Sequence, residues 1–215
     1  MTLDLWLAYL GAAVLISVSP GAGAVTSMSS GLAVGLRRGM WNILGLQIAL
    51  VGQVVLVAVG LGAVVTSSEA AFEAIRWAGV AYLVWLAIQQ WRARPHDVEA
   101  HAGAGGKRGT STPTDMSARA LVVRGFLVNA SNPKAIVFML AVLPQFVRPD
   151  RPLLPQYAAI TATSVAVDVA VMIGYTGLAA TVLAALRSPR QQMLVNRGLA
   201  AGLALAAILL ATVHH

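Results

Sequence analysis

Long apolar stretches separated by short polar segments dominate the pattern of this chain. A helix needs about 20 consecutive, mostly apolar residues to cross the roughly 30 Å hydrocarbon core of a bilayer. Six stretches reach that length, and they cover residues 3–36, 43–65, 70–91, 120–146, 157–186 and about 194–213. The pattern therefore predicts an all-α, polytopic membrane protein with six transmembrane helices.

Two of the stretches are interrupted by a proline that follows a small polar residue. The first stretch has 34 residues and would be about 51 Å long as a straight helix, which is too long for one crossing. It is interrupted at Ser19-Pro20-Gly21, and the fourth stretch is interrupted at Asn129-Ala130-Ser131-Asn132-Pro133-Lys134. A Ser or Asn before a proline is typical of an N-cap followed by the first helical residue. We therefore expect helices 1 and 4 to be broken, with a new half-helix starting at each proline.

Lysine and arginine gather on one side of the predicted membrane. Of the 15 basic residues, eleven fall in or next to the segments after the first, third and fifth stretches, and three fall on the other side. By the positive-inside rule the eleven are cytoplasmic, and both termini then lie outside. The polar segment at 92–118 is the expected cytoplasmic linker between a first repeat (1–91) and a second repeat (119–215) of one transmembrane domain. Each repeat has an odd number of helices, so the two repeats are inverted.

Composition excludes several other classes of protein. Hydrophobic residues make up 58% and charged residues 11% of the chain, against about 45–50% and about 25% in soluble domains. The chain has no cysteine, and its four histidines lie in the linker or at the C-terminus, so we expect no metal site, no cofactor and no enzymatic centre within the membrane. No phosphate-binding loop supports ATP-driven pumping. The net charge of +7 is explained by topology, so we expect no nucleic-acid partner.

Matching broken helices in inverted repeats mark the substrate site of many transporters. The alternative is that each proline only kinks a packed helix. Half-helix starts attract anions, and the few polar residues within the stretches can bind a substrate or form interhelical hydrogen bonds. The candidate substrate-binding residues are Ser19, Pro20, Gly21, Gln47, Asn129, Asn132, Pro133, Lys134 and Tyr175.

Lys134 and Asp168 are the charged candidates within the stretches. Lys134 would lie at the second position of its half-helix, where a cation opposes the helix dipole. A bound carboxylate or Asp168 would compensate it, or its side chain extends to the membrane surface. Asp168 is the only acidic residue deep in a stretch, where a charge costs at least about 2.5–3.5 kcal/mol. It is the candidate for proton coupling and for binding an ammonium group; the alternative is a structural partner of Lys134.

Polar and small residues also share helix faces. Thr161, Ser164, Asp168 and Tyr175 recur at helical spacing, which predicts a polar stripe facing a cavity. Gly31/Gly35 and Gly198/Gly202 are pairs of small residues that allow close helix approach within the subunit or in a homodimer.

The motifs around the breaks resemble those of the LysE/RhtB family of amino-acid exporters. The similar segments are Ser19-Pro20-Gly21-Ala22-Gly23, Asn132-Pro133-Lys134-Ala135-Ile136, Gly45-Leu46-Gln47, residues 77–86, Leu143-Pro144-Gln145-Phe146 and residues 168–175. They occur in order over nearly the whole chain outside the linker, and they are similar to the homoserine and homoserine lactone branch. The resemblance implies a multi-pass protein of the bacterial inner membrane.

The resemblance and the residues together predict a secondary transporter that exports small neutral amino acids, homoserine or its lactone first, by proton antiport. Its partners are then an amino-acid substrate, protons and the lipid bilayer. Export of another amino acid, of the threonine, leucine or lysine type, stays open. An ion or metal exporter would need several intramembrane carboxylates, His or Cys, and a helical scaffold would not explain the paired breaks.

Overall fold

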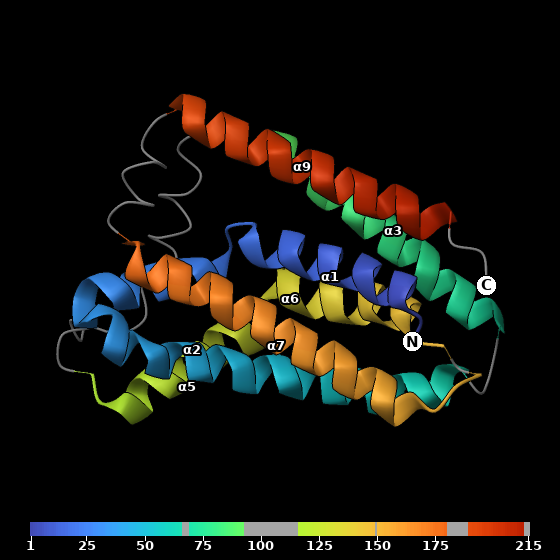
Figure 1. Cartoon of the computed structure of the whole chain (residues 1–215), viewed down its shortest axis with the longest axis horizontal. Coiled ribbons are helices and arrows are strands. Elements are labelled where there is room, and N and C mark those ends of the chain that lie inside the picture. Colours follow the sequence, from blue (N-terminus) through green and yellow to red (C-terminus); the bar gives the residue numbers. More distant parts are fainter. Residues whose placement is uncertain (66–68, 93–115, 149, 180–188, 213–215) are drawn as a thin grey trace.

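The computed structural model describes residues 1–65, 69–92, 116–148, 150–179 and 189–212, and it is helical without any strand over these ranges. Figure 1 shows the helices in sequence colours. They are α1 (Leu3–Val18), α2 (Ala22–Val65), α3 (Glu69–Arg92), α5 (Ala118–Ala130), α6 (Pro133–Val137), the π-helical turn η2 (Phe138–Val142), the 3-10 turn η3 (Leu143–Phe146), α7 (Leu153–Gly177) and α9 (Pro189–Thr212). The all-α prediction is confirmed for this part of the chain. Most of the predicted linker, residues 93–115, lies outside it.

Helix α2 consists of two arms joined by a reversal at Gly35. Gly35 has a φ of 73°, a backbone conformation that glycine adopts without the strain that a Cβ would bring. The Thr26 hydroxyl donates to Asn42 Oδ1 at 3.3 Å, although 16 residues of straight helix would separate them by about 24 Å. The chain therefore turns back here (Figure 1), and residues 22–34 (α2a) and 36–65 (α2b) form a hairpin. The use of Gly35 as a helix-packing residue was a wrong prediction, because its backbone makes the turn.

Two glycines bring α2b and α5 into backbone contact. A Cβ added to Gly45 would lie 2.0 Å from the Val122 carbonyl oxygen, and one added to Gly125 would lie 2.1 Å from the Asn42 carbonyl oxygen. Such close approach is typical of packing between membrane helices, where small residues replace a hydrophobic driving force. This contact positions α5, and with it the second break.

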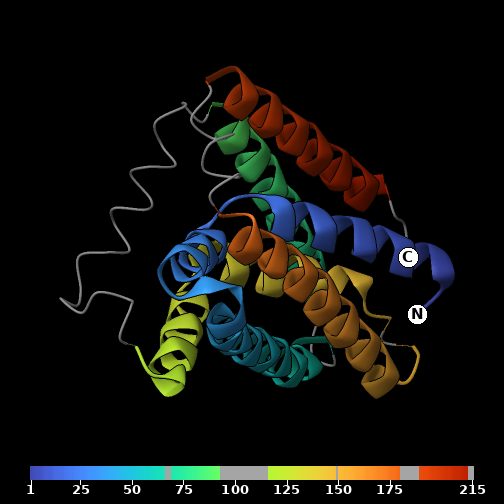
Figure 2. The same ribbon diagram turned by 60° about the vertical axis from the view of Figure 1, so that its left-hand side comes forward.

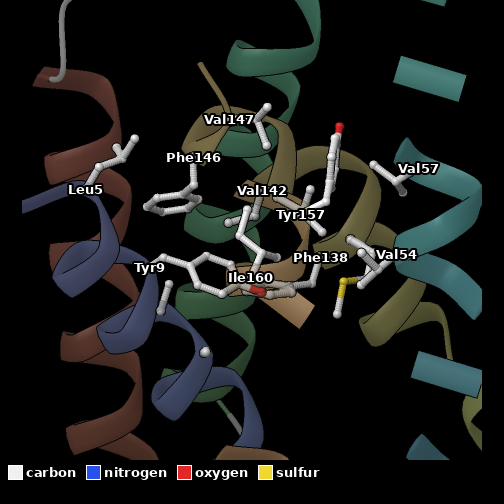
Figure 3. Close-up of a cluster of buried hydrophobic side chains, with 14 of the residues drawn as sticks. Leu5, Tyr9, Val54, Val57, Phe138, Val142, Phe146, Val147, Tyr157 and Ile160 are labelled. Carbon is white, nitrogen blue, oxygen red and sulfur yellow. The ribbon is translucent and has the colours of Figure 1, made fainter. Parts of the chain in front are cut away.

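The largest apolar core joins α1, α2b, η2, η3 and α7 (Figure 3). Tyr9 is fully buried in it and packs edge-on against Phe146, with ring centroids 5.2 Å apart. Leu5, Phe146 and Tyr157 stand near the start of α1, the end of η3 and the start of α7. The core therefore occupies the end of the bundle near the N-terminus.

The basic segments lie at the opposite end of the molecule, where two pairs of them are in contact. An Arg38 guanidinium nitrogen donates to the Met116 carbonyl at 2.8 Å, and the Arg197 guanidinium lies 5.3 Å from the centre of the Trp91 ring. These contacts join the α2 reversal to the start of α5, and the end of α3 to the start of α9. The N-terminus and the end of α9 lie at the other end in Figure 1, and Figure 2 shows α3 and α9 packed together beside the remaining helices.

Two of the described helices, or three spans if a bent pair is counted as one, are long and apolar enough to cross a bilayer. Among the described residues two pass a test of length and hydropathy, Ala22–Gly60 and Leu153–Gly177. A third span results if Ala118–Ala130 and Pro133–Phe146, bent by 55°, cross together. These are the helices of a membrane protein.

Candidate functional site

The two predicted breaks lie next to each other in space. The Lys134 ammonium nitrogen donates to the Ser19 carbonyl oxygen at 2.6 Å, across 115 residues of sequence. A Cβ added to Gly21 would lie 3.5 Å from Lys134 Cδ. The Lys134 side chain therefore runs along the first break and connects the two halves of the chain.

The second break has the predicted capping geometry. Asn132 is the N-cap of α6, its side-chain oxygen accepts from the Lys134 backbone N–H at 3.1 Å, and Pro133 follows at the first helical position. Ile136 N–H donates to the Asn132 carbonyl at 3.0 Å. Lys134 thus stands at the second position of the half-helix, as the sequence predicts.

At the first break the second helix starts two residues later than predicted, at Ala22 instead of Pro20. Ser19 is the C-cap of α1, and its N–H donates to the Leu15 carbonyl at 3.1 Å. The next helix begins later, because its first backbone bond runs from Val25 N–H to the Gly21 carbonyl at 3.0 Å. The expectation that Ser19 caps a helix starting at Pro20 was wrong. A residue before proline is disfavoured in the helical region, and Ser19 is extended with a ψ of 119°, so it ends α1.

A cavity of about 80 Å³ lies between the breaks. One water needs about 10–15 Å³ of such volume, so the cavity has room for several waters or a small polar molecule. Its lining includes six of the predicted site residues, Ser19, Gly21, Asn129, Asn132, Lys134 and Asp168. Pro20, Gln47, Pro133 and Tyr175 are not among the residues that line it.

Asp168 is half-buried on α7 and is held by groups from two other helices. Its Oδ2 accepts from the Gln47 amide at 2.6 Å, and the Ser17 hydroxyl donates to the same carboxylate. Asp168 also interacts electrostatically with Lys134. One negative and one positive group therefore line the same small cavity.

Several predicted polar residues connect helices to one another. The Asn129 amide donates to the Leu46 carbonyl at 2.9 Å, and the Asn129 carbonyl accepts from Gln53 at 2.9 Å. The Tyr175 hydroxyl donates to the Val18 carbonyl at 2.7 Å. These contacts match the interhelical alternative for Asn129, and they place Tyr175 at the end of α1 rather than on the cavity wall.

Ser17, Gln53 and Ser164 also line the cavity. The sequence pattern did not indicate the first two, and it indicated Ser164 only as part of the polar stripe. Ser164 forms a hydrogen bond with Tyr9 and donates to the Ile160 carbonyl at 2.8 Å. Gln53 is one of two glutamines, with Gln47, in a stretch that has no charged residue, a signal that could have found it. Ser17 gave no such signal, because serine is common in apolar helices. Of the predicted stripe on α7, Ser164 and Asp168 line the cavity, whereas Thr161 donates to the Tyr157 carbonyl at 2.7 Å.

The donor set suits an organic zwitterion better than a metal ion. The cavity presents one carboxylate, one ammonium and neutral amides and hydroxyls. No group of three or more His, Cys, Asp or Glu side chains occurs within the described residues.

Apolar helices that enclose a polar cavity between two half-helix starts have the arrangement of a membrane transporter. Residues 14–213 match the family described as LysE type translocator. The chain belongs to this family.

Several known proteins are similar to this chain over two thirds or more of its length. The homoserine/homoserine lactone efflux protein of Salmonella typhimurium is 40% identical over 215 residues, which is 100% of both chains. A Vibrio cholerae protein named only as an uncharacterized membrane protein is 43% identical over 197 residues, covering 92% of this chain and 91% of the relative. The leucine efflux protein of an Enterobacter species is 27% identical over 146 residues, or 67% of this chain and 64% of the relative. No solved structure gives a significant match.

Proposed function

We propose that this protein is a secondary transporter that exports small neutral amino acids, homoserine and homoserine lactone first, by proton antiport. The observation that carries the proposal is the pair of opposite charges, Lys134 and Asp168, on one cavity between two helix breaks. A zwitterionic amino acid offers the two complementary charges. The full-length relative named for homoserine and homoserine lactone efflux supports the choice of substrate.

The proposed architecture is six transmembrane spans in two inverted repeats, residues 1–91 and 119–215. The linker at 92–118 faces the cytoplasm, both termini face outside, and the membrane is the bacterial inner membrane. The described helices support this arrangement in two ways: each repeat carries a break at the cavity, and the basic segments lie at one end of the molecule.

The substrate carboxylate would lie at the half-helix starts. Backbone N–H groups at the beginning of α2a and α6 have no partner within their own helices, and they point positive dipole ends toward the cavity. Lys134 adds a charge-assisted donor there. Asp168 would hold the substrate ammonium, and the amide of Gln53 and the hydroxyls of Ser17 and Ser164 are within reach of a side-chain hydroxyl or lactone oxygen in the same cavity.

Asp168 would also couple transport to protons. An ionised carboxylate attracts the substrate ammonium, and a protonated one does not. A proton that enters from outside would therefore promote release of the amino acid on that side, and proton and substrate would compete for one group.

Uptake into inverted membrane vesicles tests this function. Vesicles with and without the protein are supplied with labelled homoserine, homoserine lactone, threonine, leucine or lysine, each with and without an imposed proton gradient. We expect protein-dependent, gradient-stimulated uptake of homoserine and its lactone. Uptake of leucine instead would assign the protein to the activity named for its more distant relatives, and equal uptake with and without the gradient would exclude proton antiport.

A further inference from the structure

Among the described residues, buried polar groups continue from the cavity along both arms of the α2 hairpin. Toward the N-terminal end, the cavity borders the apolar core, because Phe138 belongs to both. Tyr9 and Phe146 lie in the same core (Figure 3), and the buried amides of Gln145 and Gln156 are at this end too. Toward the basic end, the hairpin arms α2a and α2b carry Thr26, Ser27, Ser30 and Asn42, each at most 4% exposed. We call these four residues the inner polar segment.

The inner polar segment extends the faces that line the cavity. On α2a, Gly23 lines the cavity, and Ser27 and Ser30 follow at helical spacings of four and three residues. On α2b, Leu46 and Gln53 line the cavity, and Asn42 lies one turn before Leu46. The two arms therefore continue the same faces toward the Gly35 reversal.

Two groups of this segment have no hydrogen-bond partner among the described residues. They are the Ser30 hydroxyl and the Asn42 side-chain nitrogen, and both residues are fully buried. An unpaired polar group in an apolar surrounding costs free energy. If the Ser30 hydroxyl and the Asn42 amide served only to hold the helices together, we would expect each to have a hydrogen-bond partner. Ser27 has one, because its hydroxyl donates to the Met172 sulfur at 3.4 Å.

A cation stands beside this segment, and close packing closes its end. Arg124 is half-buried on α5, and its guanidinium donates to the Ser29 hydroxyl at 3.3 Å. A Cβ added to Gly31 would lie 2.0 Å from the Thr176 carbonyl oxygen, and one added to Gly39 would lie 2.6 Å from the Thr176 methyl group. The end of α7 is thus packed against the hairpin between the polar segment and the reversal.

We propose that the inner polar segment is the closed cytoplasmic half of the transport path, and that Arg124 binds the substrate carboxylate at its entrance. Opening would separate α7 from the hairpin at Gly31 and Gly39 and expose Ser30 and Asn42 to water and substrate. The inference rests on the proposed function for its substrate, an amino acid. Its location rests on the unpaired groups and the helix faces.

Ser30→Ala and Ser27→Ala form a matched pair for the first test, since both serines are fully buried on α2a. We expect Ser30→Ala to lower homoserine uptake into inverted vesicles several-fold and to leave the midpoint of thermal unfolding unchanged or higher, because no hydrogen bond is lost. Ser27→Ala loses a bond and should lower that midpoint. A fall of the midpoint with Ser30→Ala, or wild-type uptake by that variant, would overturn the role of Ser30.

Arg124→Gln and Arg119→Gln test the entrance. Both change an arginine of α5, but Arg119 is exposed. Loss of a charge-assisted contact worth a factor of ten corresponds to about 1.4 kcal/mol. We expect Arg124→Gln to raise the KM for homoserine about tenfold with a smaller change in maximal rate, and Arg119→Gln to change neither much. Equal effects of the two variants on KM would mean that Arg124 acts only through the overall charge of the surface and does not bind the substrate carboxylate.

A third test does not depend on the substrate. The chain has no cysteine, so Ser30→Cys introduces a single thiol. A small, membrane-impermeant thiol reagent should modify it from the side that carries Arg37 and Arg38, and faster than it modifies Ile48→Cys, which lies on an exposed apolar position of α2b. Absence of modification from that side would overturn the path. Modification of Ser30→Cys in a protein that transports no amino acid would retain the path and refute the proposed substrate.

Discussion

At the scale of single residues, Lys134 has an unfavourable interaction with the dipole of its own helix, and contacts with other parts of the chain offset it. A cation at the second position of α6 opposes the dipole of that helix. Its ammonium nevertheless lies at the C-terminal end of α1, 2.6 Å from the Ser19 carbonyl, where a cation is favourable. Lys134 therefore has two compensating partners, the end of α1 and Asp168. A substrate carboxylate would compete with the Ser19 carbonyl for this ammonium.

Lys134→Gln tests that competition. The glutamine amide can still donate to the Ser19 carbonyl, but it carries no charge for a carboxylate. We expect export of homoserine to fall about tenfold or more and export of homoserine lactone to fall less, since the lactone has no free carboxylate. Competing uptake of the two labelled substrates into the same vesicles measures the ratio. An equal loss for both substrates would mean that Lys134 only connects the two breaks.

Asp168→Asn tests the coupling group. Asparagine has the same shape, and its side-chain oxygen can still accept from Gln47, but it cannot titrate. We expect loss of gradient-driven accumulation, with weak exchange of labelled for unlabelled substrate retained. Both are measured in inverted vesicles, and Asp150→Asn, an exposed residue outside the cavity, is the control. If Asp168→Asn vesicles still accumulate substrate in response to a pH gradient, another group carries the proton.

The sequence indicated several residues that line the cavity, but it did not indicate what each one contacts. Prolines and lone charges in apolar stretches identify Lys134 and Asp168 because few other causes place them there. Their partners come from distant parts of the chain. Gln47 lies 121 residues from Asp168, and the distance between two such residues depends on helix packing, which a pattern of polar positions does not specify.

At the scale of helices, the apolar pattern predicted helical segments and the positions of the two breaks. It did not predict the backbone conformation at each break. The reversal falls at Gly35, at the end of the first predicted stretch, but the pattern did not indicate that Gly35 itself makes the turn. The π-helical turn η2 after α6 has no signal in the periodicity, because one added residue per turn does not change which residues are apolar. The close contact between α2b and α5 depends on Gly45 and Gly125.

Gly45→Ala measures that contact, with Gly52→Ala as the matched control on the same helix. A methyl group at Gly45 would meet the Val122 carbonyl oxygen at 2.0 Å, whereas nothing lies within 4 Å of a Cβ at Gly52. Overpacking of this kind costs about 1–3 kcal/mol, and alanine in an open helical position gains about 0.5–1 kcal/mol over glycine. We expect Gly45→Ala to lower the midpoint of thermal unfolding in detergent and Gly52→Ala to keep or raise it. Equal midpoints for the two variants would show that α2b and α5 do not approach this closely.

At the scale of the whole molecule, charge and polarity divide along the bundle axis. The described basic residues near the ends of α2a, α3, α5 and α9 gather at one end, and the inner polar segment leads from that end to the cavity. The apolar core occupies the other end, together with the N-terminus and the end of α9. The apolar core closes one side of the cavity and the inner polar segment closes the other. We expect the cavity to open first through the polar segment, on the side with the basic residues, because water can hydrate the polar groups that become exposed there. That side is the cytoplasm if the positive-inside rule holds.

The orientation is tested by single cysteines on the two sides, because the wild-type chain has no thiol and gives a blank background. Ala104→Cys lies in the predicted cytoplasmic linker, outside the described residues, and Arg151→Cys lies at the exposed connection before α7, near the apolar end. An impermeant thiol reagent applied to intact cells should label Arg151→Cys and leave Ala104→Cys unlabelled, and inverted vesicles should give the opposite pattern. The reason is the distribution of eleven basic residues against three, since lysine and arginine near a membrane helix resist translocation. The reverse pattern would place the inner polar segment on the outer side, and it would contradict the assignment of that segment to the cytoplasmic half of the path.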